Sequence, residues 1–173
     1  MKTKLNQSKL KLAIVSAMLL GTAGLTAPAY AAGTDENMEV KASIGLACVI
    51  ETNELNFGPY DAIVANASNP LKKEVAISST CTAGSSGKIK LNDGTNASGA
   101  QRRMVHASDG TKFLNYEVSG ASFGGLKWDT ATGVNYTGSG SKEDLPVYGQ
   151  VAAAQTSAIN GSYSDTLTAT ITY

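Results

Sequence analysis

Cys48 and Cys81 are the only cysteines in the chain, and a disulfide is the chemistry that they could share. An even pair in an exported protein is typical of a disulfide. The bond would close a loop of about 33 residues, worth about 3–4 kcal/mol in the chain-entropy model. A metal site is disfavoured because the chain has one histidine, His106, and no CxxC motif. We therefore predict a disulfide and no metal.

Two other groups of residues superficially match catalytic patterns. His106 has Ser108 and Asp109 beside it, but Ser108-Asp-Gly110 is typical of a hairpin turn rather than a Ser/His/Asp triad. The stretch from Gly84 to Lys88 is too short between its glycines for a phosphate loop, and Ile89 stands where Ser or Thr would hold magnesium. We expect no enzyme activity and no cofactor.

Residues 1–31 have the features of a signal peptide. Four lysines precede an apolar run at residues 12–25, and Ala29-Tyr-Ala31 has the form of a signal-peptidase site. That run is shorter than the roughly 20 residues of a membrane-spanning helix. We expect export, a mature chain of 173 − 31 = 142 residues with no direct membrane insertion, and a single domain.

The charge of the mature chain argues against nucleic acid as a partner. All 14 acidic residues lie after residue 31, whereas four of the 14 basic residues lie before it, which gives 10 − 14 = −4. Lys72-Lys73 and Arg102-Arg103 are isolated pairs and do not form a basic stripe.

Short alternating runs separated by Gly, Ser, Asn and Asp predict an antiparallel β-sandwich. We expect strands at residues 54–57, 73–81, 88–91, 103–106, 112–119, 126–128 and 143–151, together with one near each end of the mature chain.

The last eleven residues alternate apolar and polar with period two. Their inward face is predicted to carry Tyr163, Leu167, Ala169, Ile171 and Tyr173, and their outward face four threonines. The sequence ends within this pattern, so we expect one edge of the strand to need a neighbour from an earlier strand or from another polypeptide.

A second alternating stretch lies near the mature N-terminus. Met38, Val40, Ala42 and Ile44 alternate with polar or small residues, and the pattern continues to Ile50. It is longer than a usual strand of about 5–6 residues. It is interpreted either as the first strand of its own domain or as a separate segment followed by a strand.

Several segments, in this order, resemble the spore coat protein U-like domain family, which includes pilus subunits of the archaic chaperone–usher class. They are Cys48-Val-Ile50, Leu55-Asn-Phe-Gly-Pro-Tyr-Asp61, Cys81, Ile89-Lys-Leu91, Arg102-Arg-Met104, Leu114-Asn-Tyr116, Trp128, Val147-Tyr-Gly-Gln-Val151 and the final stretch from Gly161 to Tyr173. Val118 and Asp129 depart from the family pattern.

The resemblance implies an immunoglobulin-like sandwich without its final strand, and hence a hydrophobic groove. It further implies that a periplasmic chaperone fills the groove, that an outer-membrane usher receives the subunit, and that the N-terminal extension of another subunit then replaces the chaperone. Residues 32–44 would be this extension and residues 45–173 the pilin domain. Met38, Val40, Ala42 and Ile44 would be the donor side chains, and Leu167, Ala169, Ile171 and Tyr173 the acceptor edge. A fimbrium at the cell surface and a role in adhesion or biofilm follow by the same resemblance.

Three alternatives remain open. The donor segment could fold back into its own groove. The protein could be a secreted spore-coat or extracellular-matrix protein with a self-contained sandwich. It could also be a secreted module that binds sugars or proteins through Trp128, Tyr136 and Tyr148, although such aromatics more often belong to a core.

Overall fold

A computed structural model describes residues 33–173, so the predicted signal peptide lies outside the described residues. Ala42–Tyr173 form one compact unit, and residues 33–41 belong to a separate unit. The described part contains strands and no helix. No helix of sufficient length and apolarity to cross a membrane occurs among these residues.

The described part contains nine strands, from two to eleven residues long. In chain order they are β1 (Cys48–Thr52), β2 (Leu71–Cys81), β3 (Ser86–Leu91), β4 (Arg102–His106), β5 (Asp109–Ser119), β6 (Val134–Thr137), β7 (Lys142–Val151), β8 (Tyr163–Ser164) and β9 (Ala169–Thr172).

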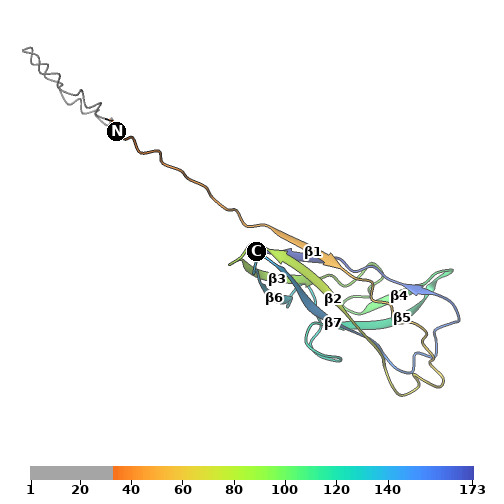
Figure 1. The fold of residues 1–173 in the computed structure, drawn as a ribbon. Helices are drawn as coiled ribbons and strands as arrows, with labels where there is room; N and C mark the ends of the chain where they lie inside the picture. The colour runs from red at the N-terminus through yellow and green to blue at the C-terminus, as the bar shows by residue number, and fades with distance from the viewer. Residues whose placement is uncertain (1–32) are drawn as a thin grey trace, which may run out of the picture. The chain divides into compact units, whose positions relative to one another are not determined.

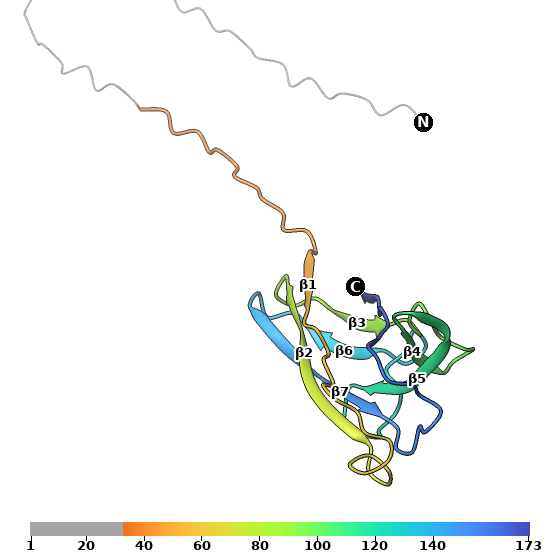
Figure 2. The same cartoon turned by 90° about the vertical axis from the view of Figure 1, so that its right-hand side faces the viewer.

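These strands form two antiparallel sheets (Figures 1 and 2). The larger sheet has the order β1-β2-β7-β5-β4-β8, and the smaller has the order β6-β3-β9. The apolar faces of both sheets bury side chains that include Ile89, Val118 and Val151. Trp128, in the loop after β5, is also buried and donates its Nε1–H to the Ile89 carbonyl of the smaller sheet at 2.7 Å. The predicted all-β antiparallel sandwich is confirmed.

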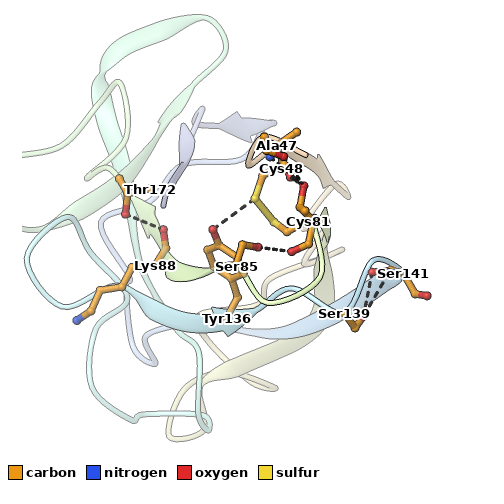
Figure 3. The surroundings of a disulfide bond; sticks show 11 residues. Ala47, Cys48, Cys81, Ser85, Lys88, Tyr136, Ser139, Ser141 and Thr172 are labelled. Atoms are coloured by element: carbon orange, nitrogen blue, oxygen red, sulfur yellow. Dashed lines mark hydrogen bonds between the residues drawn. A yellow bond between two sulfur atoms is a disulfide. The ribbon is translucent and has the colours of Figure 1, made fainter. Parts of the chain in front are cut away.

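The predicted disulfide is present and fixes the start of the larger sheet (Figure 3). Cys48 opens β1 and lies opposite Cys81, the last residue of β2, with their Cα atoms 4.1 Å apart. The hydroxyl of Tyr136, on β6 of the smaller sheet, lies 3.3 Å from the Cys48 sulfur. The bond therefore sits where the two sheets meet, at the end of β2.

The strand pattern differs from the prediction in three places. Residues 54–57 and 126–128 form no strand, although Lys127 makes an isolated bridge to Ser119. The sequence analysis missed β6, a four-residue strand flanked by glycines at 133 and 138. Residues 126–128 were predicted as a strand because they contain apolar residues. The indole of Trp128 instead fills the core from a loop.

The predicted C-terminal strand is interrupted and changes sheets. Its first part, β8, pairs with β4 of the larger sheet, and its second part, β9, pairs with β3 of the smaller sheet. The alternation of burial nevertheless continues across the break, since the odd-numbered residues 163–171 are half-buried and the even-numbered ones are exposed. Period two therefore predicted the buried face correctly up to Ile171, whereas Tyr173, also predicted to face inward, is exposed because it follows the last paired residue of β9. The pattern could not show that two sheets share the strand.

Candidate strand-binding groove

The main cavity of the described residues is a groove with an apolar floor and a volume of about 1110 Å³, which exceeds the roughly 300–1,000 Å³ of a usual small-molecule pocket. One wall is formed by residues 52–63, and the opposite wall by residues 158–167 with Ala169. The floor is the apolar inner face between these walls, and its residues are Leu71, Val75, Ile77, Leu91, Met104, Leu114, Tyr116, Val147 and Val151. We call this cavity the groove, and its two sides the 52–63 wall and the 158–169 wall.

The 52–63 wall continues the chain from β1 but leaves the β1–β2 ladder after Thr52. Side-chain bonds hold it at both ends: Asn53 Nδ2 donates to the Ala76 carbonyl at 2.9 Å, and the Tyr60 hydroxyl donates to the Ala152 carbonyl at 2.8 Å. Between these points, the main-chain N–H and C=O groups of residues 54–57 have no hydrogen-bond partner among the described residues. This part of the wall is an unpaired edge.

A glycine in β7 allows the 52–63 wall to lie close over the floor. A Cβ atom at Gly149 would come within 2.6 Å of Leu55 and 2.9 Å of Phe57, two half-buried apolar residues of this wall. The Phe57 ring also packs edge-on against Tyr116 of β5, with ring centroids 6.2 Å apart. Any side chain at position 149 would therefore push the ends of the Leu55 and Phe57 side chains aside and change the shape of the groove.

The 158–169 wall is paired on one edge only. The carbonyls of Thr166 and Thr168 accept hydrogen bonds from the N–H groups of Thr95 and Asn92, at 3.2 and 3.1 Å. Since alternate residues of an extended chain direct their main-chain groups to opposite edges, those of Leu167 point away from residues 92–95. They have no partner among the described residues. Both walls thus present unpaired main-chain groups, which is the state of a strand edge that accepts another strand.

A partly buried polar cluster holds the 158–169 wall in place. Asp165 accepts a hydrogen bond from the Tyr116 hydroxyl at 2.7 Å and from the Asn96 N–H at 3.0 Å. A Cβ atom at Gly94 would lie 2.0 Å from the Asp165 carboxylate, so only glycine leaves room for it. Burial, and then the hydrogen bond to Asp165, raises the pKa of Tyr116 far above its usual value. The hydroxyl therefore stays protonated and remains a donor.

His106 has a structural role at the end of the groove. The Ser108 N–H donates to Nδ1 at 3.2 Å, so Nε2 carries the proton and donates to the Asn160 carbonyl at 3.1 Å. Its ring packs against Tyr163, and a Cβ atom at Gly161 would lie 2.0 Å from Nε2. Both ring nitrogens are thus engaged with main-chain groups of the two adjoining loops. Among the described residues, no three His, Cys, Asp or Glu side chains are placed to hold a metal ion.

The predicted acceptor residues lie in different surroundings. Leu167 and Ala169 line the groove. Ile171 lies beyond it, paired with Ile89 of β3, and Tyr173 is largely exposed at the end of β9. The sequence analysis did not identify the 52–63 wall as part of the groove. The alternation of Leu55 and Phe57 was the signal that could have identified it.

The predicted donor residues lie in a segment without secondary structure. Residues 33–47 form no strand, and Met38, Val40 and Ile44 are 86%, 81% and 88% exposed. Ala42 is exposed as well. Three large apolar side chains at alternate positions are therefore open to solvent in one short segment.

The aromatics considered for ligand binding do not form one site. Trp128 and Tyr136 are buried in the core, as expected for sandwich aromatics. Tyr148 packs edge-on against Phe123, with ring centroids 5.1 Å apart, on the face of β7 away from the core residue Val147.

Comparisons with known proteins agree with this architecture. A similar chain occurs in the crystal structure of the CsuC–CsuE chaperone–tip adhesion subunit pre-assembly complex from archaic chaperone–usher Csu pili of Acinetobacter baumannii. The match has a TM-score of 0.52 and 19% identity, and it covers 75% of the present chain and 40% of the other. The present chain thus spans less than half of that neighbour, and the likeness identifies the fold as an immunoglobulin-like sandwich.

Comparison of sequences shows a higher identity than this structural match does. Protein U of Myxococcus xanthus is 32% identical over 160 residues, which cover 84% of this chain and 88% of that protein. The model of the Spore Coat Protein U domain family matches residues 34–170. That match includes the exposed N-terminal segment, both walls and the disulfide. The chain therefore belongs to the Spore Coat Protein U domain family.

Proposed function

We propose that this protein is a structural subunit of a surface pilus or fimbria, and that it polymerises by donor-strand exchange. The observation that carries the proposal is the groove, whose two walls both present unpaired main-chain groups over an apolar floor. A strand inserted there would gain main-chain hydrogen bonds on both sides, and its alternate side chains would enter the groove. No enzyme activity is part of this function.

The N-terminal segment has the dimensions of such a strand. Met38–Ile44 would span about 20 Å at roughly 3.3 Å per residue, and residues 163–169 of the 158–169 wall would span the same length if equally extended. Burying the three large side chains of the donor, at about 1.5–3 kcal/mol each, would contribute about 5–9 kcal/mol before ordering costs. The match in length and alternation supports Met38, Val40, Ala42 and Ile44 as the donor residues.

The connection to β1 favours a donor from another copy. Three residues separate Ile44 from Cys48, which is fixed by the disulfide and by its pairing with Cys81. The groove begins at Thr52, about 13 Å farther along the chain at roughly 3.3 Å per residue. A reversal of the chain directly before Cys48 would bring Ile44 to the rim of its own groove, with Met38–Ser43 beyond it, but it would require a tight turn within residues 45–47. A segment from another copy needs no such turn, which favours it as the donor.

The comparisons support a pathway for assembly. The similar fold occurs in a complex of a chaperone with a pilus subunit, and the chain belongs to a family that resembles archaic chaperone–usher pilins. We infer export to the periplasm, capping of the groove by a periplasmic chaperone, delivery to an outer-membrane usher, and a final place in a cell-surface fimbrium. A role in adhesion or biofilm follows from the resemblance.

Deletion of residues 34–44 tests the proposal. Because β1 begins at Cys48, the shortened subunit is expected to fold and to bind the chaperone, but not to polymerise. A full-length variant with Ser at positions 38, 40, 42 and 44 should behave in the same way. The matched control Ser43→Ala, on the other face of the segment, should polymerise normally. Fibres from the deletion variant, detected by electron microscopy, would overturn the mechanism.

A second function is favoured by the family itself. Its description and the similarity to Protein U suggest a secreted spore-coat or extracellular-matrix protein with a self-contained sandwich. That protein would assemble without a chaperone or usher. Purification of a stable monomer from the periplasm of cells that lack both components would favour this alternative.

A further inference from the structure

We propose that Lys41 of one copy pairs with Glu54 of the next copy when the donor segment occupies the groove, and that this ion pair fixes the register of insertion. The inference rests on the proposed donor-strand function. It names a second copy of this chain as the occupant and identifies a residue on each side that sets specificity.

The groove has one carboxylate that is available to a partner. Three carboxylates line it and, among the described residues, no lysine or arginine does. Asp61 accepts hydrogen bonds from the N–H groups of Ile63 and Val64, at 2.9 and 3.0 Å, and these bonds lower its pKa. Asp165 is engaged by Tyr116 and Asn96, as described above. Glu54 has no ion pair and no hydrogen bond to its side chain within residues 33–173.

Glu54 lies on the outer face of its wall. Its neighbour Leu55 and the next odd residue, Phe57, are half-buried against the floor, whereas Glu54 is exposed. Glu51, three residues earlier in β1, is already paired with Lys142 of β7 at 2.6 Å. The opposite wall presents threonines 166 and 168 on its outer face. Glu54 is therefore the one uncompensated charge beside the strand that would enter.

Lys41 is the only cation of residues 33–47 and would lie on the matching face. If Val40 and Ala42 point to the floor, the residue between them points outward. Paired residues of adjacent strands have side chains on the same face, so Lys41 and Glu54 face the same way in either a parallel or an antiparallel insertion. In the free segment, Lys41 pairs only with Glu39 at 2.6 Å, and both side chains are about three-quarters exposed, at 76% and 74%. Such an exposed pair contributes little, so Lys41 is available to Glu54.

The pair would discriminate between registers. A shift of two residues keeps the apolar side chains on the floor, so alternation alone does not exclude it. One such shift, however, places Glu39 opposite Glu54, and like charges directly opposite each other are destabilising. Hydrophobic burial thus selects the face of the donor, and the charge pair selects which of its positions lies beside Glu54.

The experiment is a double-mutant cycle on the intact chain. The acceptor is the full-length protein with Ser at positions 38, 40, 42 and 44, so that its own donor segment cannot compete. Its affinity for a labelled synthetic peptide of residues 34–46 is measured by fluorescence anisotropy. Two peptides, unchanged and Lys41→Glu, are each measured with two acceptors, unchanged at position 54 and Glu54→Lys. This gives the four combinations of the cycle.

Each single reversal is expected to weaken binding by about two- to fivefold, and the double reversal to restore the affinity to within about twofold. In 1 M NaCl the differences should disappear, because the Debye length falls to about 3 Å. The matched control Glu51→Lys should not discriminate between the two peptides. Thermal unfolding of each acceptor checks that it remains folded.

Two results would overturn the inference, and they are distinguishable. If the unchanged peptide binds but the two reversals act additively, the ion pair is wrong and donor-strand insertion still holds. If the unchanged peptide does not bind at all, both the pair and the proposed function are wrong.

Discussion

The two ends of the described chain have the same alternating sequence pattern but differ in strand pairing and burial. Residues 38–46 and residues 163–173 both alternate apolar and polar side chains with period two. In the C-terminal segment every second residue from 163 to 171 is half-buried. In the N-terminal segment Met38, Val40 and Ile44 are exposed, and no strand forms.

The difference lies in the neighbours and not in the residues. The C-terminal segment pairs with β4, with residues 92–95 and then with β3, each along the same edge. The N-terminal segment has no strand partner among the described residues. A single strand cannot bury one face or satisfy its main-chain groups by itself. An alternating pattern therefore predicts the face that a strand would bury, and a partner is still needed before the strand can form.

The largest expected effect on stability comes from the disulfide at Cys48, the first residue of β1, which follows the unpaired N-terminal segment. Replacing both Cys48 and Cys81 by Ala should lower the free energy of unfolding by about 3–4 kcal/mol, because the cross-link closes a loop of about 33 residues. Urea unfolding measures this loss. Tyr136→Phe, which removes the hydroxyl beside the Cys48 sulfur but keeps the bond, should cost less than about 1 kcal/mol. An equally small loss for the double alanine variant would contradict the prediction.

Replacing one isoleucine by alanine at each end of the described chain tests the comparison directly. Ile171→Ala should lower the free energy of unfolding of the monomer by about 1–2 kcal/mol, less than for a fully buried isoleucine, since Ile171 is half-buried against Ile89. Ile44→Ala should change it by less than about 0.5 kcal/mol, since Ile44 is exposed. In the polymer, however, Ile44→Ala should lower the temperature at which subunits dissociate. A loss of monomer stability in Ile44→Ala would show that the segment is already folded onto its own chain.

The smallest expected effect concerns the polar anchor of the C-terminal segment. The pKa of Tyr116 is raised in the folded state, so the protein binds this proton more tightly folded than unfolded. The stabilisation is complete below the unfolded value of 10.0 and decreases above it, by at most about 1.4 kcal/mol per pH unit. Denaturant unfolding between pH 9 and pH 11 (about one unit either side of that value) measures the slope. Tyr116→Phe should make it shallower, and an unchanged slope would mean that other groups cause the alkaline loss.

Much of the fold could be predicted from local sequence. The central strands β2, β5 and β7 have the alternation and flanking turn residues that predicted them, and two cysteines in a chain that was predicted to be exported indicated the disulfide. Residues 54–57 were predicted as a strand because Leu55 and Phe57 alternate. They bury these side chains without pairing their main chain, a distinction that alternation alone does not contain.

The groove was predicted only in part. Leu167 and Ala169 were expected at its edge and line it. The contribution of Asp165 could not be predicted, because its partners Tyr116 and Asn96 lie 49 and 69 residues away in the chain. Gly149 likewise gave no local signal, since its role is to leave space for Leu55 and Phe57 of a distant segment.

By itself, the sequence determined the inward face of the long strands, where the chain is cross-linked and which of its segments alternate as a strand does. These properties depend on residue type and on a period of two, both of which are local. Only the tertiary structure decided which edges are paired, because pairing depends on segments that meet across long loops. It placed the unpaired edges of residues 54–57 and Leu167 on opposite walls of one groove with an apolar floor, and it left Met38–Ile44 outside any sheet.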